Sequence, residues 1–248
     1  MPRFFVDQRP EGETFLGGED GRHIAKSLRM RPGEALTLCD GQGTDYGCRV
    51  ISCDGEGALV QVENSAPSKG EPRTKVTVCQ CLAKGDKLET VTQKSVELGA
   101  WEIWPVESSR CVVRLDGKSA GKKTARLQKI AREAAMQSGR GRIPQVLEPA
   151  PLKQALETAA REGEILFFYE QGKESLKKAL SSAGDRLFVF VGPEGGFSPE
   201  EAALAQSLGG KLLTLGPRIL RTETAPLAAL ACVFYERGDM ELEGGDLP

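Results

Sequence analysis

The spacing of apolar and polar positions divides the chain into an N-terminal stretch of short strands and a longer region in which strands alternate with helices. Alternating apolar positions bounded by turn residues predict strands at residues 35–39, 47–52 and 58–63. A helix is predicted at residues 20–28, with Asp20 as its cap. The close spacing of the strands predicts a small β-barrel. A polar, proline-containing segment at residues 64–72 predicts a linker, which ends the first domain at residue 70.

After this linker, short apolar runs are separated by helical patterns. Strands are predicted at residues 75–82, 103–105, 165–169, 187–191 and 211–215. Helices are predicted at residues 122–138 and 226–236, and a third runs to residue 98 from an Asp86 cap that Glu89 completes. Such alternation is typical of a parallel sheet covered by helices. We therefore expect an α/β domain with a mainly parallel sheet over residues 71–248, preceded by the β domain of residues 1–70.

Two loops rich in glycine and proline follow the last two predicted strands. The first is the segment 192–201 (GPEGGFSPEE) and the second is the segment 215–226 (LGPRILRTETAP). Open α/β sheets bind ligands at the carboxyl ends of their strands, and glycine lets a ligand approach the backbone closely. We expect the two loops to form two walls of one pocket. Ser198, Pro199 and Glu201 also match a capping box at a helix start, which by itself requires no ligand.

Composition changes this picture mainly through the distribution of charge. The 248 residues include 33 Lys or Arg and 35 Asp or Glu, so the net charge of −2 does not by itself indicate nucleic acid. Residues 110–142, however, contain ten Lys or Arg against only Asp116 and Glu133. A second cluster without acidic residues consists of Arg22, Lys26, Arg29 and Arg31. Two basic patches are typical of a protein that binds a polyanion across two surfaces, although each alone also fits a solvated helix face.

Cysteine and histidine usage gives no support for a metal site. The seven cysteines show no C-x-x-C spacing, and His23 is the single histidine. We expect reduced thiols, no metal and a cytoplasmic protein, because no apolar stretch is long enough to cross a membrane and residues 1–5 do not begin a signal peptide. The segment 117–124 resembles a phosphate-binding loop, but its glycine spacing differs and no strand precedes it, so a charged helix start is predicted.

Six segments together carry a resemblance that covers nearly the whole chain. The two most specific are residues 191–197 (VGPEGGF) and 215–225 (LGPRILRTETA), and weaker support comes from residues 1–5, 84–89, 93–99 and 133–140. In these segments the chain resembles the small-subunit ribosomal RNA uridine-N3 methyltransferases, members of the SPOUT class with a trefoil knot. Met136 stands where this family often has an acidic residue. Pro226 replaces a small or polar residue, which predicts Ala225 as the N-cap of the final helix.

The resemblance implies a PUA-like N-terminal barrel, a homodimer, and S-adenosylmethionine bound in the knot. Its expected activity is methylation of N3 of a specific uridine in the 16S rRNA of the small ribosomal subunit, without a metal. The expected cofactor-binding residues are Tyr169, Glu170, Val191, Gly192, Pro193, Glu194, Gly195, Gly196, Leu215, Gly216, Ile219, Leu220, Arg221, Thr222, Thr224 and Ala225. The expected RNA-binding residues are Arg3, Arg22, Lys26, Arg29, Lys122, Lys123, Arg126, Arg132 and Arg140.

Methylation of uracil N3 requires loss of the N3 proton, so a base or a donor that stabilises the uracil anion is expected. Our hypothesis is that Arg140 holds phosphate or stabilises this anion with the help of Gln137. Either Glu223 or Glu194 is the candidate base. An ordinary surface role for Arg140, and a role for each glutamate in pairing with loop N–H groups, remain open.

The sequence leaves two other functions open. One is a SPOUT methyltransferase acting on another rRNA or tRNA position, such as a ribose 2′-hydroxyl, and the other is a non-catalytic RNA-binding factor. The sequence also does not identify the assembly state of the RNA substrate, or whether both subunits of a dimer act on one RNA.

Overall fold

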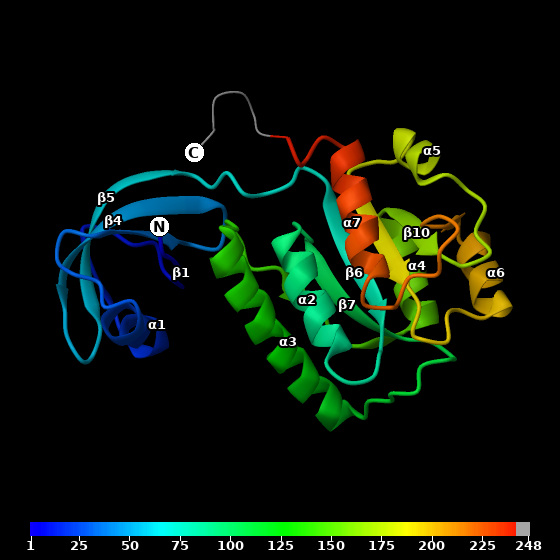
Figure 1. The fold of residues 1–248 in the computed structure, drawn as a ribbon, viewed down its shortest axis with the longest axis horizontal. Coiled ribbons are helices and arrows are strands. Elements are labelled where there is room, and N and C mark those ends of the chain that lie inside the picture. The colour runs from blue at the N-terminus through cyan, green and yellow to red at the C-terminus, as the bar shows by residue number, and fades with distance from the viewer. Residues whose placement is uncertain (242–248) are drawn as a thin grey trace. The chain divides into compact units, whose positions relative to one another are not determined.

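A computed structural model describes residues 1–241 of the chain, which form two compact units (Figure 1). The first unit consists of Met1–Glu71 together with Ala135–Ile143. The second begins at Pro72, is interrupted by that short segment, and resumes at Pro144. A single boundary after residue 70, as expected from the linker, does not include this return of the chain to the first unit.

The first unit is built on a five-stranded curled sheet. Its strands are β1 (Arg3–Phe5), β2 (Glu13–Leu16), β3 (Ala35–Cys39), β4 (Thr44–Cys53) and β5 (Ala58–Pro67). Their order is β1-β3-β4-β5-β2; β1 and β3 pair in parallel and the other pairs are antiparallel. Register shifts between β4 and β5 at Gly47/Cys48 and Val50/Ser52 bend the long hairpin. Because Thr44 pairs with Pro67, β5 extends into the segment that the sequence predicted as a linker.

The predicted helix of residues 20–28 is only partly correct. A short α1 (Gly18–Arg22) passes directly into a π-helical turn, His23–Ser27, labelled η1. Gly17 occupies the N-cap position and Asp20 lies within the first turn, so the predicted cap at Asp20 is wrong. Arg29 ends this region in the left-handed conformation, with a φ angle of 52°.

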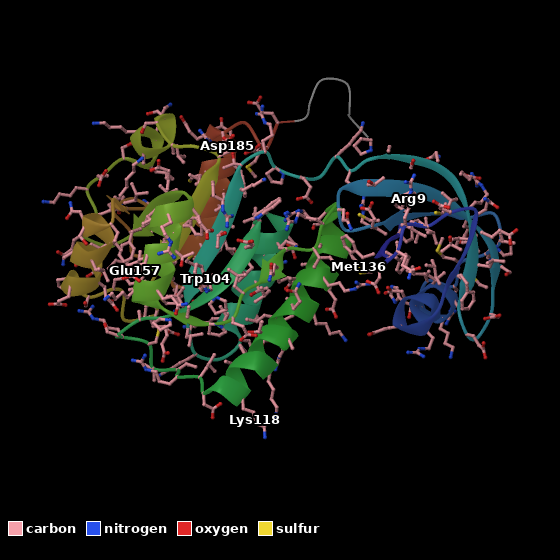
Figure 2. All side chains as sticks on the ribbon, turned by 180° about the vertical axis from the view of Figure 1, so that it is seen from behind. Arg9, Trp104, Lys118, Met136, Glu157 and Asp185 are labelled. Carbon is pink, nitrogen blue, oxygen red and sulfur yellow. The ribbon has the colours of Figure 1, made fainter. Side chains whose placement is uncertain are left out.

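The segment Ala135–Ile143 is attached to the first unit by a buried ion pair and by apolar packing. Arg140 donates to both carboxylate oxygens of Glu71 at 2.8 and 2.7 Å, and the backbone N–H of Gly141 donates to Glu71 Oε1 at 2.9 Å. Met136, labelled near one end of α3 in Figure 2, packs against the apolar core of this unit. That contact gives the methionine a packing role at the position where the resembling family often has an acid.

The second unit contains a sheet in which every paired strand is parallel. Its strands are β6 (Lys75–Cys81), β7 (Glu102–Glu107), β8 (Gln145–Val146), β9 (Ala150–Pro151), β10 (Glu164–Phe168), β11 (Arg186–Val191) and β12 (Lys211–Leu213). Their order is β12-β10-β11-β6-β7-β8, with β9 also paired to β7. The central strand β11 is apolar and buried from Leu187 to Val191. The predicted α/β class with a mainly parallel sheet is therefore confirmed.

Helices pack against this sheet. They are α2 (Lys87–Glu97), α3 (Gly117–Ser138), α4 (Leu152–Glu162), α5 (Leu176–Ser181), α6 (Pro199–Ser207) and α7 (Ala225–Glu236). Figure 1 shows α2 and α7 side by side, and both contact β6. The start of α3 at Gly117 agrees with the charged helix start predicted there.

The helix caps agree with the sequence at α6 and differ at α2 and α7. Ser198 and Glu201 form the predicted capping box of α6. Asp86 is the N-cap of α2, but its side chain makes no capping hydrogen bond. The N-cap of α7 is Thr224 rather than Ala225, which is the first helical residue.

Candidate functional site

A cavity of about 600 Å³ lies within the second unit, where β10, β11 and β12 end. Its walls are the segments that follow these strands, mainly residues 191–197 and 213–223. Pockets for small ligands usually measure about 300–1,000 Å³, so this one has the size of a ligand site. The two glycine- and proline-rich loops thus share one cavity.

The first wall folds back tightly on itself between β11 and α6. A Cβ atom added to Gly192 would lie 3.1–3.2 Å from backbone atoms of Gly196, and Gly196 itself has a φ angle of 65°. The N–H of Gly196 donates to the carbonyl of Pro193 at 2.9 Å. Phe197, at the end of this loop, packs against Phe167 on β10, with the two ring centroids 4.1 Å apart. Glycine suits both positions, because a side chain at Gly192 would crowd the backbone of Gly196 and because other residues rarely adopt the φ angle of Gly196.

The second wall leads from β12 into α7. Gly216 turns the chain with a φ angle of 96°, a conformation that other residues rarely adopt. Beyond this turn, the side chain of Ile219 is 87% exposed although it lines the cavity. An apolar side chain left open at a cavity provides a surface against which a flat, apolar ligand group can pack.

A buried hydroxyl group connects the two walls. The Thr222 hydroxyl donates to the carbonyl of Gly192 at 2.7 Å, and Gln80 Nε2 on β6 donates to Thr222 Oγ1 at 2.9 Å. Thr222 and Gln80 are both buried. Gln80 on the inner strand β6 positions Thr222, and Thr222 positions the first loop through the Gly192 carbonyl. These buried hydrogen bonds fix the spacing of the two walls.

One lysine lies between two carboxylates at the cavity. Lys87 Nζ is 2.8 Å from Glu194 Oε1 and 3.7 Å from Glu223 Oε2. Burial alone would raise the pKa of Glu194, but hydrogen bonds from Lys87 and from the Lys84 N–H lower it below its ordinary value. The hydrogen bond to Glu194 in turn raises the pKa of Lys87. Glu194 and Lys87 are therefore both charged near neutral pH.

Nearly all residues that the sequence predicted for cofactor binding lie around this cavity. The lining includes Tyr169, Glu170, Val191, Gly192, Pro193, Glu194, Gly195, Gly196, Leu215, Gly216, Ile219, Leu220, Arg221, Thr222 and Ala225. Thr224 is not among the lining residues and instead precedes α7 as its N-cap. Phe197, Pro217 and Arg218 also line the cavity; they belong to the two loops predicted as its walls but were not named as cofactor-binding residues. Sequence reasoning missed Lys87, Phe168, Leu213 and Thr214. The segment 84–89, which contains Lys87, contributed to the resemblance but received no role.

The residues predicted for catalysis separate into two groups. Glu223 lines the cavity, whereas Arg140 and Gln137 belong to the first unit. Arg140 is only 2% exposed and its guanidinium holds Glu71, while Gln137 is exposed. A guanidinium buried in this way cannot contact phosphate or uracil without breaking its ion pair. This placement favours a structural role for Arg140, and its catalytic role stays a prediction.

The residues predicted to bind RNA differ in how accessible their charges are. Arg22, Lys26 and Arg29, beside the π-helical turn, are exposed, as is Lys122 on α3. Lys123 and Arg126 on α3 both pair with Glu89 on α2, at 3.1 and 2.7 Å. Arg3 is largely buried against Asp45. Arg132 is half-buried.

Residues 1–241 contain no group of three or more His, Cys, Asp or Glu side chains placed to hold a metal ion. Over the same described part of the chain, no helix combines the length and the apolar character needed to cross a membrane. Each of the seven cysteines is a free thiol.

Comparison with known proteins identifies both parts of the chain. Residues 70–234 match the family described as RNA methyltransferase domain, and residues 16–63 match the RNA methyltransferase PUA domain. Together the two matches place the chain in the class of RNA methyltransferases that carry a PUA domain.

Comparison with individual relatives identifies the family within this class. The chain is 37% identical to ribosomal RNA small subunit methyltransferase E of Bacillus subtilis (strain 168), over 96% of this chain and 100% of the relative. It therefore belongs to the ribosomal RNA small subunit methyltransferase E family.

Two solved structures that share this fold contain S-adenosylmethionine. The ribosomal RNA small subunit methyltransferase E of Neisseria gonorrhoeae, bound to S-adenosylmethionine, has a TM-score of 0.86 and 34% identity, covering 95% of this chain and 97% of the other. A methyltransferase from Legionella pneumophila in complex with the same cofactor has a TM-score of 0.85 and 31% identity, covering 94% and 96% of the two chains.

Proposed function

We propose that this protein uses S-adenosylmethionine to methylate N3 of a specific uridine in the 16S rRNA of the small ribosomal subunit. The observation that carries the proposal is the single cavity formed by the two glycine- and proline-rich loops, tied together by Thr222. The relatives' names support the rRNA substrate, and the two cofactor-bound relatives support the methyl donor. The uridine N3 position comes from the resemblance described above. Since rRNA is the substrate, the proposal places the protein in the cytoplasm.

The residues present at the cavity fit an adenosyl cofactor. Gly192, Gly195 and Gly196 line the cavity without side chains, so this part of the wall is available to ribose and to the methionine chain. Backbone groups of residues 215–220 would pair with the adenine edge, and Ile219 and Leu220 would pack against its face. The Glu170 carboxylate at the cavity suits the cofactor's ammonium group.

When bound, the cofactor supplies a methyl group on a positively charged sulfur, whose bonding electron pair stays on the sulfur after transfer. The protein's own contribution is to hold the acceptor base in line with that methyl group, which supplies much of the rate acceleration. It must also remove the N3 proton of uracil. No residue needs to form a covalent bond with the substrate.

RNA binding is assigned to the basic groups of both units. Exposed Arg22, Lys26, Arg29 and Lys122 would contact phosphates directly. Lys123, Arg126 and Arg132 contribute to the same positive surface of α3, although Lys123 and Arg126 also neutralise Glu89. Arg3 and Arg140 would reach RNA only if their present ion pairs opened.

The decisive experiment measures methyl transfer by the purified protein to small ribosomal subunits and to naked 16S rRNA, followed by mass spectrometry of the nucleosides. The expected product is 3-methyluridine at one position. A ribose 2′-O-methyl product would replace the N3 assignment with the ribose alternative. Cofactor binding by calorimetry without any methyl transfer to either RNA would favour the non-catalytic alternative.

A homodimer and the trefoil knot are further parts of this proposal, because the resemblance implies both. Helix α7 is apolar along its length, and Cys232 and Tyr235 remain exposed on it, which suits a face covered by a second copy of the chain. Sedimentation equilibrium should give a dimer, and Tyr235→Glu should shift it toward monomer. A monomer at micromolar concentration would contradict this part.

A further inference from the structure

The cavity contains a positively charged side chain that neither loop provides. Lys87 is the first residue of α2 and precedes Glu194 by 107 positions in the sequence. Its ammonium group forms a 2.8 Å hydrogen bond with Glu194 on the first wall, and lies 3.7 Å from Glu223 Oε2 on the second wall. A single cation therefore faces one carboxylate from each wall.

The two carboxylates differ in what they would lose on protonation. Glu194 accepts hydrogen bonds from Lys87 Nζ and from the N–H of Lys84, and protonation would weaken both. Glu223 Oε2 is buried and accepts no hydrogen bond, although the Glu223 side chain as a whole is 25% exposed. Glu223 is therefore the carboxylate that can accept a proton at Oε2 without losing a hydrogen bond.

We propose that Glu223 is the base that accepts the N3 proton of uracil, and that Lys87 is a positioning residue that holds the Glu223 side chain in place. This inference rests on the function proposed above. The N3–H bond breaks and its proton passes to a Glu223 oxygen. The electron pair left on N3 forms the new bond to the methyl carbon, as the carbon–sulfur bond of the methyl donor breaks and leaves its electron pair on sulfur. Glu223 then releases the proton to solvent, and the cycle is balanced without a metal or a redox partner.

The charged groups that share the cavity with Glu223 are Lys87, Glu170, Glu194, Arg218 and Arg221. Among these, the Lys87 ammonium forms an ion pair with Glu223 Oε2 at 3.7 Å. A cation at this distance attracts the carboxylate and restricts the positions that its side chain can adopt. Because the hydrogen bond to Glu194 raises the pKa of Lys87, the lysine is charged near neutral pH.

The first test compares Glu223→Gln with the wild type in single-turnover methylation at saturating cofactor and RNA. Loss of a positioned base should slow methyl transfer by roughly 10²–10⁴-fold, while cofactor affinity by calorimetry changes little. Methyl transfer by Glu223→Gln at the wild-type rate would overturn the inference. If the wild type itself formed no 3-methyluridine, the proposed function would fail together with the inference, so the two failures are distinguishable.

The second test isolates Lys87 with a readout that is independent of turnover. In protein labelled with ¹³C at glutamate carboxyl groups, the NMR signal missing from Glu223→Gln identifies Glu223. This signal should shift and broaden in Lys87→Met, because the carboxylate is no longer held by its ion pair, and should stay close to the wild-type signal in Lys87→Arg.

The matched control is Lys94→Met, which removes an ammonium from the same helix that pairs with Glu97 outside the cavity. This control should leave both the Glu223 signal and methyl transfer unchanged. Methyl transfer should slow in Lys87→Met and recover in Lys87→Arg. An unchanged Glu223 signal in Lys87→Met would overturn the role assigned to Lys87.

Discussion

Thr222 connects the two walls of the cavity through one hydroxyl group, so we expect cofactor affinity to depend on it. Thr222→Val keeps the shape of the side chain but leaves the Gly192 carbonyl without its donor, while Gln80 Nε2 keeps its hydrogen bond to the Cys81 carbonyl. An unsatisfied buried group costs roughly 1–3 kcal/mol, and each 1.4 kcal/mol is about tenfold in affinity. Calorimetry should show S-adenosylmethionine binding at least about fivefold weaker.

Thr222→Ser is the matched control for this prediction, because it retains the hydroxyl and removes only a methyl group. Its affinity should stay close to that of the wild type. Equal affinities for Thr222→Val and the wild type would show that the walls keep their spacing without this connection.

Arg140 and Glu71 provide a second prediction at the scale of single residues. Arg140→Met should lower the stability of the first unit by about 3 kcal/mol, because it leaves a partly buried carboxylate without its cation. Hydrogen–deuterium exchange of residues 135–143 should become faster. Arg49→Met serves as the control: its ion pair with Glu63 is about half exposed, and its loss should cost much less than the loss of Arg140. Equal effects of both variants would argue against a structural role for Arg140.

The residues of the site that the sequence predicted are those with a local signal. Gly192 and Gly216 belong to loops whose composition is unusual in itself. Lys87 lies in a segment that contributed to the resemblance, but no local pattern indicates its role. Its partners Glu194 and Glu223 lie more than a hundred positions away, and only folding brings them together. The ion pair of Arg140 could not be predicted for the same reason, because its partner Glu71 is 69 positions away.

At the scale of elements, the capping box of α6 links the cavity wall to a neighbouring loop. Glu201 Oε2 accepts from the Ser198 N–H at 2.8 Å, and Glu201 Oε1 accepts from the Ser109 N–H at 2.7 Å. Ser198→Ala should destabilise the protein by about 1 kcal/mol, as is usual for loss of an N-cap. Thermal denaturation measures this loss, and Ser207→Ala, at the exposed end of the same helix, should have a smaller effect. Equal melting temperatures for both variants would contradict the prediction.

The accuracy of the element predictions follows from how much of each element's stability is local. β10 and β11 are continuous apolar runs and α6 has its own capping box, so these strands and this helix were predicted from the sequence. Helix α4 was missed, although its buried Leu152, Ala155, Leu156 and Ala159 have helical spacing. The two-residue strands β8 and β9 exist only through pairing with β7, and no pattern that short is informative.

At the scale of the whole molecule, charge distribution predicts how RNA binding depends on salt. Each phosphate contact with single-stranded or duplex nucleic acid adds about 0.7–0.9 to the slope of log affinity against log salt. The triple variant Arg22→Gln/Lys26→Gln/Arg29→Gln should therefore lower the slope for 16S rRNA fragments by about 2. Lys153→Gln, an exposed change on α4, should leave it unchanged. Binding that barely varies with salt would contradict the assignment of both basic patches.

The return of residues 135–143 to the first unit has a consequence for how the protein is made. While the chain emerges from a translating ribosome, the N-terminal β domain lacks Arg140 and Met136 until half of the polypeptide has been synthesised. Until then Glu71 has no counter-charge and part of an apolar surface is uncovered. Expression of residues 1–71 alone should therefore yield a fragment that associates with chaperones, whereas a fragment ending beyond residue 143 carries the missing piece.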